Sequence, residues 1–207
     1  PEIIKLLNTI QGKIEPSIYS ACRNNTGDVR IVNCGHKHSR VLSDYMMSIY
    51  QLNRLRNQVH AYAQKPNIRN NASRLSDVNK VASKLSCIRT QSDEITLTCS
   101  NEGCGPTTYA LNPRNAEGQI QLCPRFFALS PSSMSATLIH EMSHDCGTLD
   151  FEYYYYDNDR VSNPNPTNTD SIQKFFGWST DIIPKNADNF RLWAQEGFCL
   201  PGYDCRK

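Results

Sequence analysis

The chain has 207 residues and a mass of 23.5 kDa, with 39% hydrophobic residues, 20% charged residues and a formal net charge of +2 at pH 7. This balance excludes a disordered chain, and no apolar run approaches the roughly 18 residues needed to cross a bilayer, so we expect no membrane partner. Basic and acidic residues are scattered, which predicts no nucleic-acid partner. We expect one domain over residues 1–207 and a monomer.

Nine cysteines indicate structural disulfides and therefore an oxidising compartment. Close pairs such as Cys99/Cys104 and Cys199/Cys205 suit loop staples, although the connectivity cannot be deduced from the sequence. No Cys-x2-Cys pair occurs, which disfavours a zinc ribbon. The chain begins without an export signal, so we expect a mature or trimmed form of a secreted, extracellular protein, with the periplasm as the alternative.

Helical periodicity dominates the first 90 residues. Leu42, Tyr45, Ile49, Leu52 and Val59 recur at helical spacing with polar residues between them, which predicts a long amphipathic helix over 39–63. Two shorter helices are expected, over 2–10 and 73–85.

The period changes after residue 94, where a small sheet is predicted. Hydrophobic and polar residues alternate over 95–100, and the glycines and proline of 103–106 indicate a hairpin-like turn. A second alternating stretch over 118–123 predicts another strand, which Pro124 ends.

A helix is predicted to begin at Ser130 and Pro131, because serine can cap the backbone N–H groups and proline suits the first helical position. It should run to about residue 145, and Gly147 suits the left-handed residue that closes a helix. Residues 160–170 have a loop composition, and short helices are expected over 170–178 and 186–196. The expectation is an α+β fold with a mainly helical part over 1–90 and a zinc-binding catalytic part over 91–207.

Two histidines four residues apart, His140 and His144, project from one face of that helix and can bind one metal ion. Glu141 lies beside them. Zinc with an open coordination position lowers the pKa of bound water, and a neighbouring carboxylate can take the water's proton as it attacks a carbonyl. The pattern predicts metal-assisted hydrolysis with one Zn2+ per chain.

A third metal ligand is expected after the helix. Asp150 follows His144 beyond a glycine that can reverse the chain, and it is our choice. Asp145 is too close along the helix to turn onto the same ion easily. Cys146 stays open, because a disulfide role is at least as compatible with its position. The remaining candidates are Glu152, Asp157 and Glu196.

The stretches HEMSH, GTLDFEYY and Asn186-Ala187-Asp188 together resemble the aspzincin metallopeptidases, which include fungal deuterolysins and lysine-specific metalloendopeptidases and share the signature HExxH followed by GTxDxxYG. The resemblance covers about 118–193. It implies a zincin-like fold, a protein or peptide substrate, and a hydrogen bond from Tyr153 to the developing oxyanion. It also implies the site that the residues themselves suggest, with zinc on His140, His144 and Asp150 and with Glu141 as the general base.

The sequence departs from the family pattern in places. Tyr154 replaces the last glycine of the signature, and the link between its two halves is shorter than in the fungal enzymes. The lysine-specific members are thought to read lysine with an aspartate and a glutamate three residues later, and these positions are Asp188 and Arg191 here. Because Arg191 would repel an ammonium group, we expect Asp188 to line or support the substrate pocket without strict lysine specificity.

Other metal-site patterns fit less well. Residues 140–150 also spell the metzincin pattern with aspartate as third ligand, but all four methionines precede the end of this pattern, so no methionine turn can follow. A gluzincin would need Glu196 without its usual flanking pattern. His36 and His38 alternate without nearby carboxylates and are expected to be structural.

We predict a secreted zinc endopeptidase whose substrate lies extended along an edge strand, within 118–123. One alternative keeps this metal site but directs it at a specialised target, such as a cell-wall peptide or a host protein, as a toxin or effector would. The other alternative is a disulfide-stapled binding module without enzymatic activity.

Overall fold

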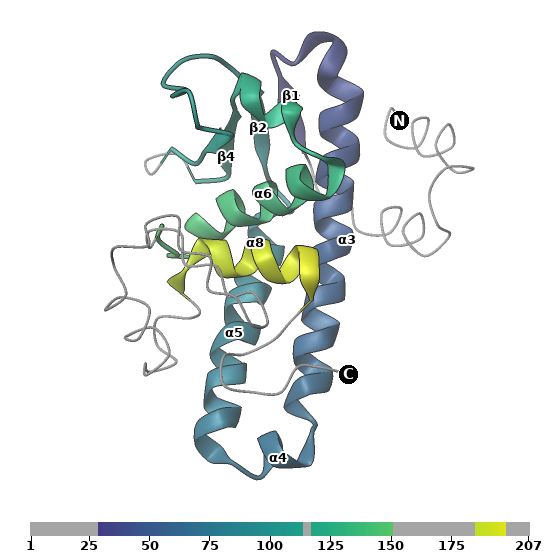
Figure 1. Ribbon diagram of the computed structural model, residues 1–207, viewed down its shortest axis with the longest axis vertical. Coiled ribbons are helices and arrows are strands. Elements are labelled where there is room, and N and C mark those ends of the chain that lie inside the picture. Colours follow the sequence, from purple (N-terminus) through teal and green to yellow (C-terminus); the bar gives the residue numbers. More distant parts are fainter. Residues whose placement is uncertain (1–28, 114–116, 151–184, 198–207) are drawn as a thin grey trace, which may run out of the picture.

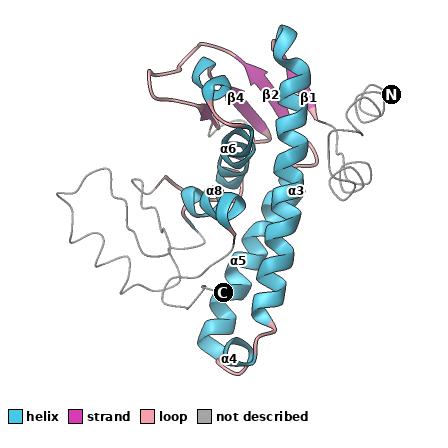
Figure 2. Cartoon of the chain, turned by 45° about the vertical axis from the view of Figure 1, so that its right-hand side comes forward, coloured by secondary structure: helices cyan, strands magenta, loops and turns pink. Residues whose placement is uncertain are grey.

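The computed structural model describes residues 29–113, 117–150 and 185–197. A small sheet lies at one end of a long hairpin formed by helices α3 (His38–Ala63) and α5 (Ala72–Gln91), as Figure 1 shows. Helices α6 (Pro131–His144) and α8 (Ala187–Glu196) lie between the sheet and the far end of this hairpin, and they pack against each other and against α3. Figure 2 shows the same separation of helices and strands, which confirms the predicted α+β class.

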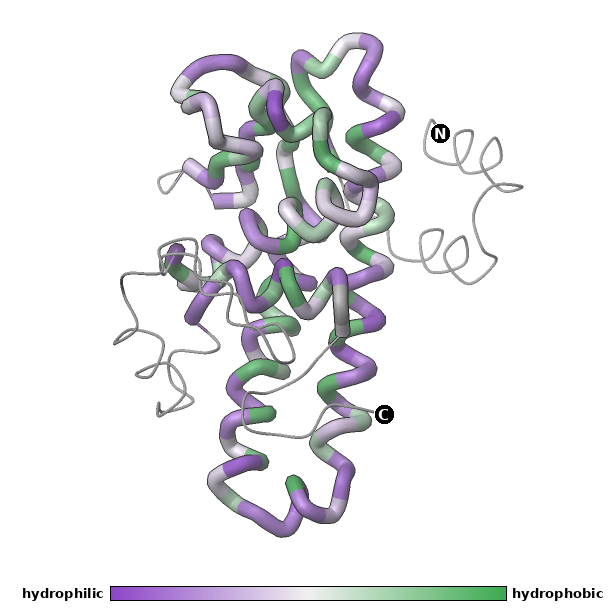
Figure 3. The backbone as a smooth tube through the Cα atoms, viewed as in Figure 1, coloured by the Kyte–Doolittle hydropathy of each residue, from purple (hydrophilic) through white to green (hydrophobic). Residues whose placement is uncertain are grey.

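Helix α3 is the longest element, and its 26 residues span about 39 Å. Its buried side chains include Val41, Tyr45, Leu52 and Val59, which recur at spacings of four and seven residues, as expected for one face of a helix. Hydrophobic and hydrophilic positions consequently alternate along the helix in Figure 3. A single turn of 3-10 helix, η1 (Gly35–Lys37), leads into α3.

Helix α5 is longer than the predicted 73–85 segment, because Ile88 continues the buried stripe beyond it. Asn71 caps its start by accepting a hydrogen bond from the backbone N–H of Arg74. The short helix α4 (Pro66–Arg69) makes the turn between α3 and α5. The helices predicted over 2–10 and 170–178 and the loop over 160–170 lie outside the described residues.

The sheet has four described strands: β1 (Arg30–Val32), β2 (Thr96–Cys99), β3 (Ala110–Leu111) and β4 (Gln119–Leu122), in the order β1-β2-β4-β3. β2 runs parallel to both β1 and β4, and β3 is antiparallel to β4. The hairpin-like turn predicted over 103–106 therefore does not join two paired strands: β3 is the next strand in the chain, but it pairs with β4, and β2 and β4 are parallel.

The predicted edge strand is also corrected. β4, which corresponds to the predicted strand over 118–123, is paired on both sides, whereas β3 stands at the edge of the described sheet. β3 has only two residues, too few for an alternating pattern to be visible in the sequence. β1 was not expected either, although its run of Ile31 and Val32 favours a strand.

Helix α6 begins and ends as predicted. Oγ of Ser130 accepts a hydrogen bond from the N–H of Ser133, and Pro131 is the first helical residue. After the helix, Gly147 has a φ of 74°, in the left-handed region that glycine adopts most easily. This turn sends the chain back towards the last residues of α6.

Three disulfides join the described part of the chain: Cys34–Cys99, Cys87–Cys146 and Cys104–Cys123. The suggested Cys99/Cys104 pairing is wrong. β1 and β2 are parallel neighbours that end together, so Cys99 at the end of β2 faces Cys34 just beyond β1. Cys199 and Cys205 lie outside the described residues. No helix in the described ranges is long and apolar enough to cross a membrane.

Candidate metal centre

Three predicted ligands meet at the carboxyl end of α6. Oδ1 of Asp150 lies 3.0 Å from Nε2 of His140 and 3.4 Å from Nε2 of His144. One helical turn separates the two histidines, so both rings face the same side, and the turn at Gly147 brings Asp150 back in front of them. The structure thus brings two imidazole nitrogens and one carboxylate oxygen together.

The separations between these atoms suit a zinc ion. Two ligand atoms bound at ordinary zinc distances lie about 3.3 Å apart in a tetrahedral site. The distances from Oδ1 of Asp150 to the two Nε2 atoms, 3.0 and 3.4 Å, are close to this value. The three side chains therefore need to move little to bind one ion. The side chain of Asp150 is 63% exposed, so solvent can reach this group of ligands from the side of Asp150.

Glu141 belongs to the same group. Possible ligand atoms of His140, Glu141 and His144 all lie within 4.8 Å of one another, and Glu141 is buried. These separations would allow Glu141 to serve as a ligand. Asp150 is the better candidate, because its Oδ1 lies only 3.0 and 3.4 Å from the Nε2 atoms of His140 and His144. That arrangement leaves the Glu141 carboxylate beside the metal position, where a general base is needed.

Two other predicted alternatives for the third ligand point elsewhere. Both carboxylate oxygens of Asp145 are occupied, Oδ1 by Nδ2 of Asn112 and Oδ2 by the N–H of Gly118. Cys146 is bonded to Cys87 and has no thiolate to offer. Glu152, Asp157 and the side chain of Glu196 lie outside the described part of the structure.

The loop after α6 also orients His144. Nδ1 of His144 lies 3.1 Å from the carbonyl oxygen of Thr148, so an N–H at Nδ1 leaves the Nε2 lone pair facing Asp150. The hydroxyl of Thr148 lies 2.6 Å from that of Ser143, which donates to the carbonyl of His140. The loop therefore supplies the Asp150 carboxylate and fixes one imidazole ring.

The second imidazole has its own carboxylate. Nδ1 of His140 is buried and lies 3.2 Å from Oδ1 of Asp188, the first-turn acid of α8. Nε of Arg191 donates to the same oxygen at 3.0 Å. Asp188 is itself almost fully buried. Its charge is thus compensated by a side chain of its own helix and by the imidazole that it faces.

Charge coupling within the site is strong. Hydrogen bonds from His140 and His144 hold the pKa of the Asp150 carboxyl well below its usual range. Burial disfavours the His140 imidazolium, but the neighbouring carboxylates of Asp150 and Asp188 outweigh burial and raise its pKa to about 10. Burial raises the pKa of the Glu141 carboxyl, against the opposing effect of both histidines. A divalent cation would replace the protons that these groups share.

A cavity of about 300 Å³ opens beside this group. One wall is β3 with the residues that precede it, and the other is formed by α6 and α8, including Thr137, His140 and Glu141. Asp150, Asp188 and Arg191 complete the lining. The edge strand, His140 and Glu141 therefore border one cavity.

Comparison with known proteins agrees with this geometry. Residues 68–195 match the family described as lysine-specific metallo-endopeptidases, the aspzincins, and this match covers more than half of the chain. The chain belongs to this family. The predicted resemblance is confirmed, and it begins earlier than the expected residue 118, since the aspzincin match includes all of α5. Comparison with curated proteins found no match.

Membership makes the protein an aspzincin metallopeptidase, for which zinc is the expected metal. The structure brings together five of the six predicted site residues: His140, Glu141, His144, Asp150 and Asp188. The sixth, Tyr153, lies outside the described residues.

Sequence reasoning missed the residues that support this group. Thr148 stands within the GTLD stretch, but its carbonyl oxygen orients His144, and a backbone atom leaves no residue-type signal. Asn112 donates from Nδ2 to the Glu141 carbonyl and to Asp145, and so joins the segment after β3 to α6. No pattern in the sequence pointed to that contact.

Proposed function

We propose that this aspzincin is a secreted endopeptidase that binds one Zn2+ through His140, His144 and Asp150 and uses Glu141 as its general base. The observation that carries the proposal is the convergence of both Nε2 atoms on Oδ1 of Asp150, at 3.0 and 3.4 Å. A bound zinc ion would act as a Lewis acid that makes water a nucleophile near neutral pH.

Glu141 suits a role in proton transfer. It adjoins His140, and its burial raises the pKa of its carboxyl towards the range in which it can both accept and return a proton. It would take a proton from the attacking water and deliver it to the leaving amine. Its backbone carbonyl is held by Asn112, which fixes the position of this residue relative to β3.

The substrate would lie along β3. An extended peptide can add to the free edge of a sheet through backbone hydrogen bonds, and β3 borders the cavity that Glu141 lines. The scissile carbonyl would then face the histidine and aspartate ligands. We propose that Tyr153, on the basis of family membership, donates a hydrogen bond to the oxyanion.

We do not propose strict selection of lysine, although the family is described as lysine-specific. The pocket carboxylate Asp188 already faces His140 and Arg191, and Arg191 adds a positive charge to the cavity lining. A lysine side chain would meet this charge on entry. We propose that the cavity accepts neutral or acidic side chains in preference to lysine.

Secretion is proposed from the disulfides. Three of them join described residues, and disulfides of this kind persist in oxidising compartments.

The test compares wild type with Glu141→Gln in cleavage of a mixed peptide library, with zinc content measured for both. We expect one zinc per chain in both proteins and a loss of cleavage rate of at least about 100-fold in the variant. Full activity in Glu141→Gln would refute the assigned base. Zinc in the wild type without cleavage of any peptide would favour a binding module instead.

A further inference from the structure

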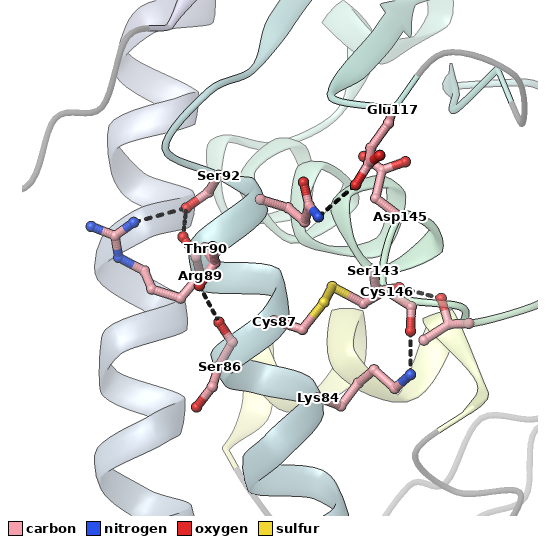
Figure 4. Close-up of a disulfide and its surroundings, with 12 residues drawn as sticks. Lys84, Ser86, Cys87, Arg89, Thr90, Ser92, Glu117, Ser143, Asp145 and Cys146 are labelled. Atoms are coloured by element: carbon pink, nitrogen blue, oxygen red, sulfur yellow. Dashed lines mark hydrogen bonds between the residues drawn. A yellow bond between two sulfur atoms is a disulfide. The ribbon is translucent and has the colours of Figure 1, made fainter.

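Helix α5 holds Cys146 at two points. Cys87 forms a disulfide with it, and Nζ of Lys84 donates a hydrogen bond to its carbonyl oxygen. Figure 4 shows both contacts side by side, with Lys84 one helical turn before Cys87 on the same face of α5. Neither residue lines the cavity next to Glu141 or reaches the proposed ligands.

Cys146 occupies a critical place in the chain. It follows His144 by two residues and precedes Asp150 by four. Between Cys146 and Asp150 the chain makes the left-handed turn at Gly147 and presents the Thr148 carbonyl to His144. Because this link is only four residues long, a displacement of Cys146 would also displace the Thr148 carbonyl and the Asp150 carboxylate.

The Lys84 contact has an electrostatic component. The last carbonyl groups of a helix carry partial negative charge, and an ammonium group there stabilises the helix end. Lys84 is partly buried, and burial together with the nearby Lys185 lowers the pKa of its amine. The ammonium group of Lys84 is thus held at the carboxyl end of α6 by a specific hydrogen bond, and it is not a freely solvated surface charge.

The other side of the loop is attached separately. Leu149 donates its N–H to the carbonyl of Lys185 and accepts from the N–H of Ala187, at the start of α8. The loop from Cys146 to Asp150 is therefore fixed between α5 on one side and the start of α8 on the other.

We infer that α5 is a positioning element of the metal centre, in which Cys87 and Lys84 act through Cys146 to hold the Asp150 carboxylate and the Thr148 carbonyl in place. This inference rests on the proposed function, because it assumes that Asp150 and His144 bind the metal. The two α5 residues are positioning residues and take no part in the chemistry.

The structure offers a matched control. Cys34–Cys99 closes a loop of 65 residues and Cys87–Cys146 one of 59, so their removal relaxes the unfolded chain to a similar extent. Cys34–Cys99 joins the ends of β1 and β2, and neither of its cysteines belongs to the loop after α6. Both double variants, Cys87→Ser with Cys146→Ser and Cys34→Ser with Cys99→Ser, should lose stability, but only the first should disturb the metal centre.

The experiment measures the zinc dissociation constant by competition with a chromophoric chelator, and the visible absorption spectrum of the Co2+-substituted protein. Removal of Cys87–Cys146 should weaken zinc binding about 10-fold or more and change the Co2+ spectrum, as loss of groups that orient metal ligands does elsewhere. Removal of Cys34–Cys99 should lower the Tm and leave both metal readouts unchanged.

Lys84 provides a second test with every disulfide intact, should a double variant fail to fold. Lys84→Met should weaken zinc binding several-fold, and Lys84→Arg, which keeps the cation, should restore it. Equal zinc affinity in wild type, Lys84→Met and the Cys87/Cys146 variant would overturn the inference and leave the proposed function standing. Failure of the wild type itself to bind zinc would overturn both.

Discussion

Oδ1 of Asp188 lies 3.2 Å from Nδ1 of His140, so α8 supports an imidazole whose other nitrogen faces Asp150. A carboxylate that accepts a hydrogen bond from a ligating imidazole fixes the ring and strengthens it as a metal ligand. We propose that Asp188 acts in this way on the metal centre, separately from any contact with substrate.

Asp188→Asn should weaken zinc binding about 10-fold or more, because the amide keeps the shape of the side chain and loses the charge that faces His140. The measurement is chelator competition at fixed pH. Asp145→Asn is the matched control: Asp145 bonds to Asn112 and Gly118 rather than to a histidine. An equal loss of zinc affinity in both variants would show that the effect is not specific to the His140 contact.

Arg191→Glu should shift cleavage towards lysine. The change replaces a cation in the cavity lining by a carboxylate, next to Asp188. We expect kcat/KM for a lysine peptide to rise about 10-fold relative to an otherwise identical leucine peptide, which corresponds to about 1.4 kcal/mol. Arg191→Lys, which keeps the positive charge, should leave this ratio as it is in wild type. An unchanged ratio in Arg191→Glu would remove Arg191 from the determinants of specificity.

The buried carboxyl of Asp44 predicts a pH dependence of the stability of the folded protein. This α3 carboxyl is buried, and burial raises its pKa to about 7 against the opposing charge of Arg40. The folded state therefore binds a proton between about pH 4 and 7 that the unfolded state has released, and stability falls as pH rises through this window.

Asp44→Asn should remove this dependence. Its Tm relative to wild type should be nearly constant below pH 4, rise between pH 4 and 7, and stay higher by a few degrees above pH 7. Thermal unfolding followed by circular dichroism across this range measures the difference. A Tm difference that does not vary with pH would mean that Asp44 does not titrate in this window.

The elements that the sequence predicted carry strong local signals. α3 has a buried residue at each helical turn, and α6 has a serine cap, an early proline and a glycine after its end. His140 and His144 lie on that predicted helix, so their juxtaposition follows from its period alone. Asp150 could be chosen because a single turn at Gly147 separates it from the helix.

The features that escaped prediction depend on contacts between distant segments. β1 and β3 have three and two residues, too few to show a period, and the parallel pairing of β2 with β4 depends on where β3 lies. The partner of Cys99 followed from this strand order rather than from sequence spacing, because Cys34 and Cys99 lie at the ends of the paired strands β1 and β2. The contact of His140 with Asp188 joins α6 to α8, and that of Cys146 with Lys84 joins the loop after α6 to α5, so neither partner's element alone predicts either contact.

The central claim is that His140, His144 and Asp150 bind one zinc ion, and elemental analysis of purified protein tests it most directly. Wild type, His144→Ala and Asp150→Ala would be purified without added metal and compared at equal concentration. We expect one zinc per chain in wild type and loss or marked weakening of zinc binding in both variants. A wild-type protein that takes up no zinc even after reconstitution, or an Asp150→Ala variant that retains it fully, would refute this set of ligands.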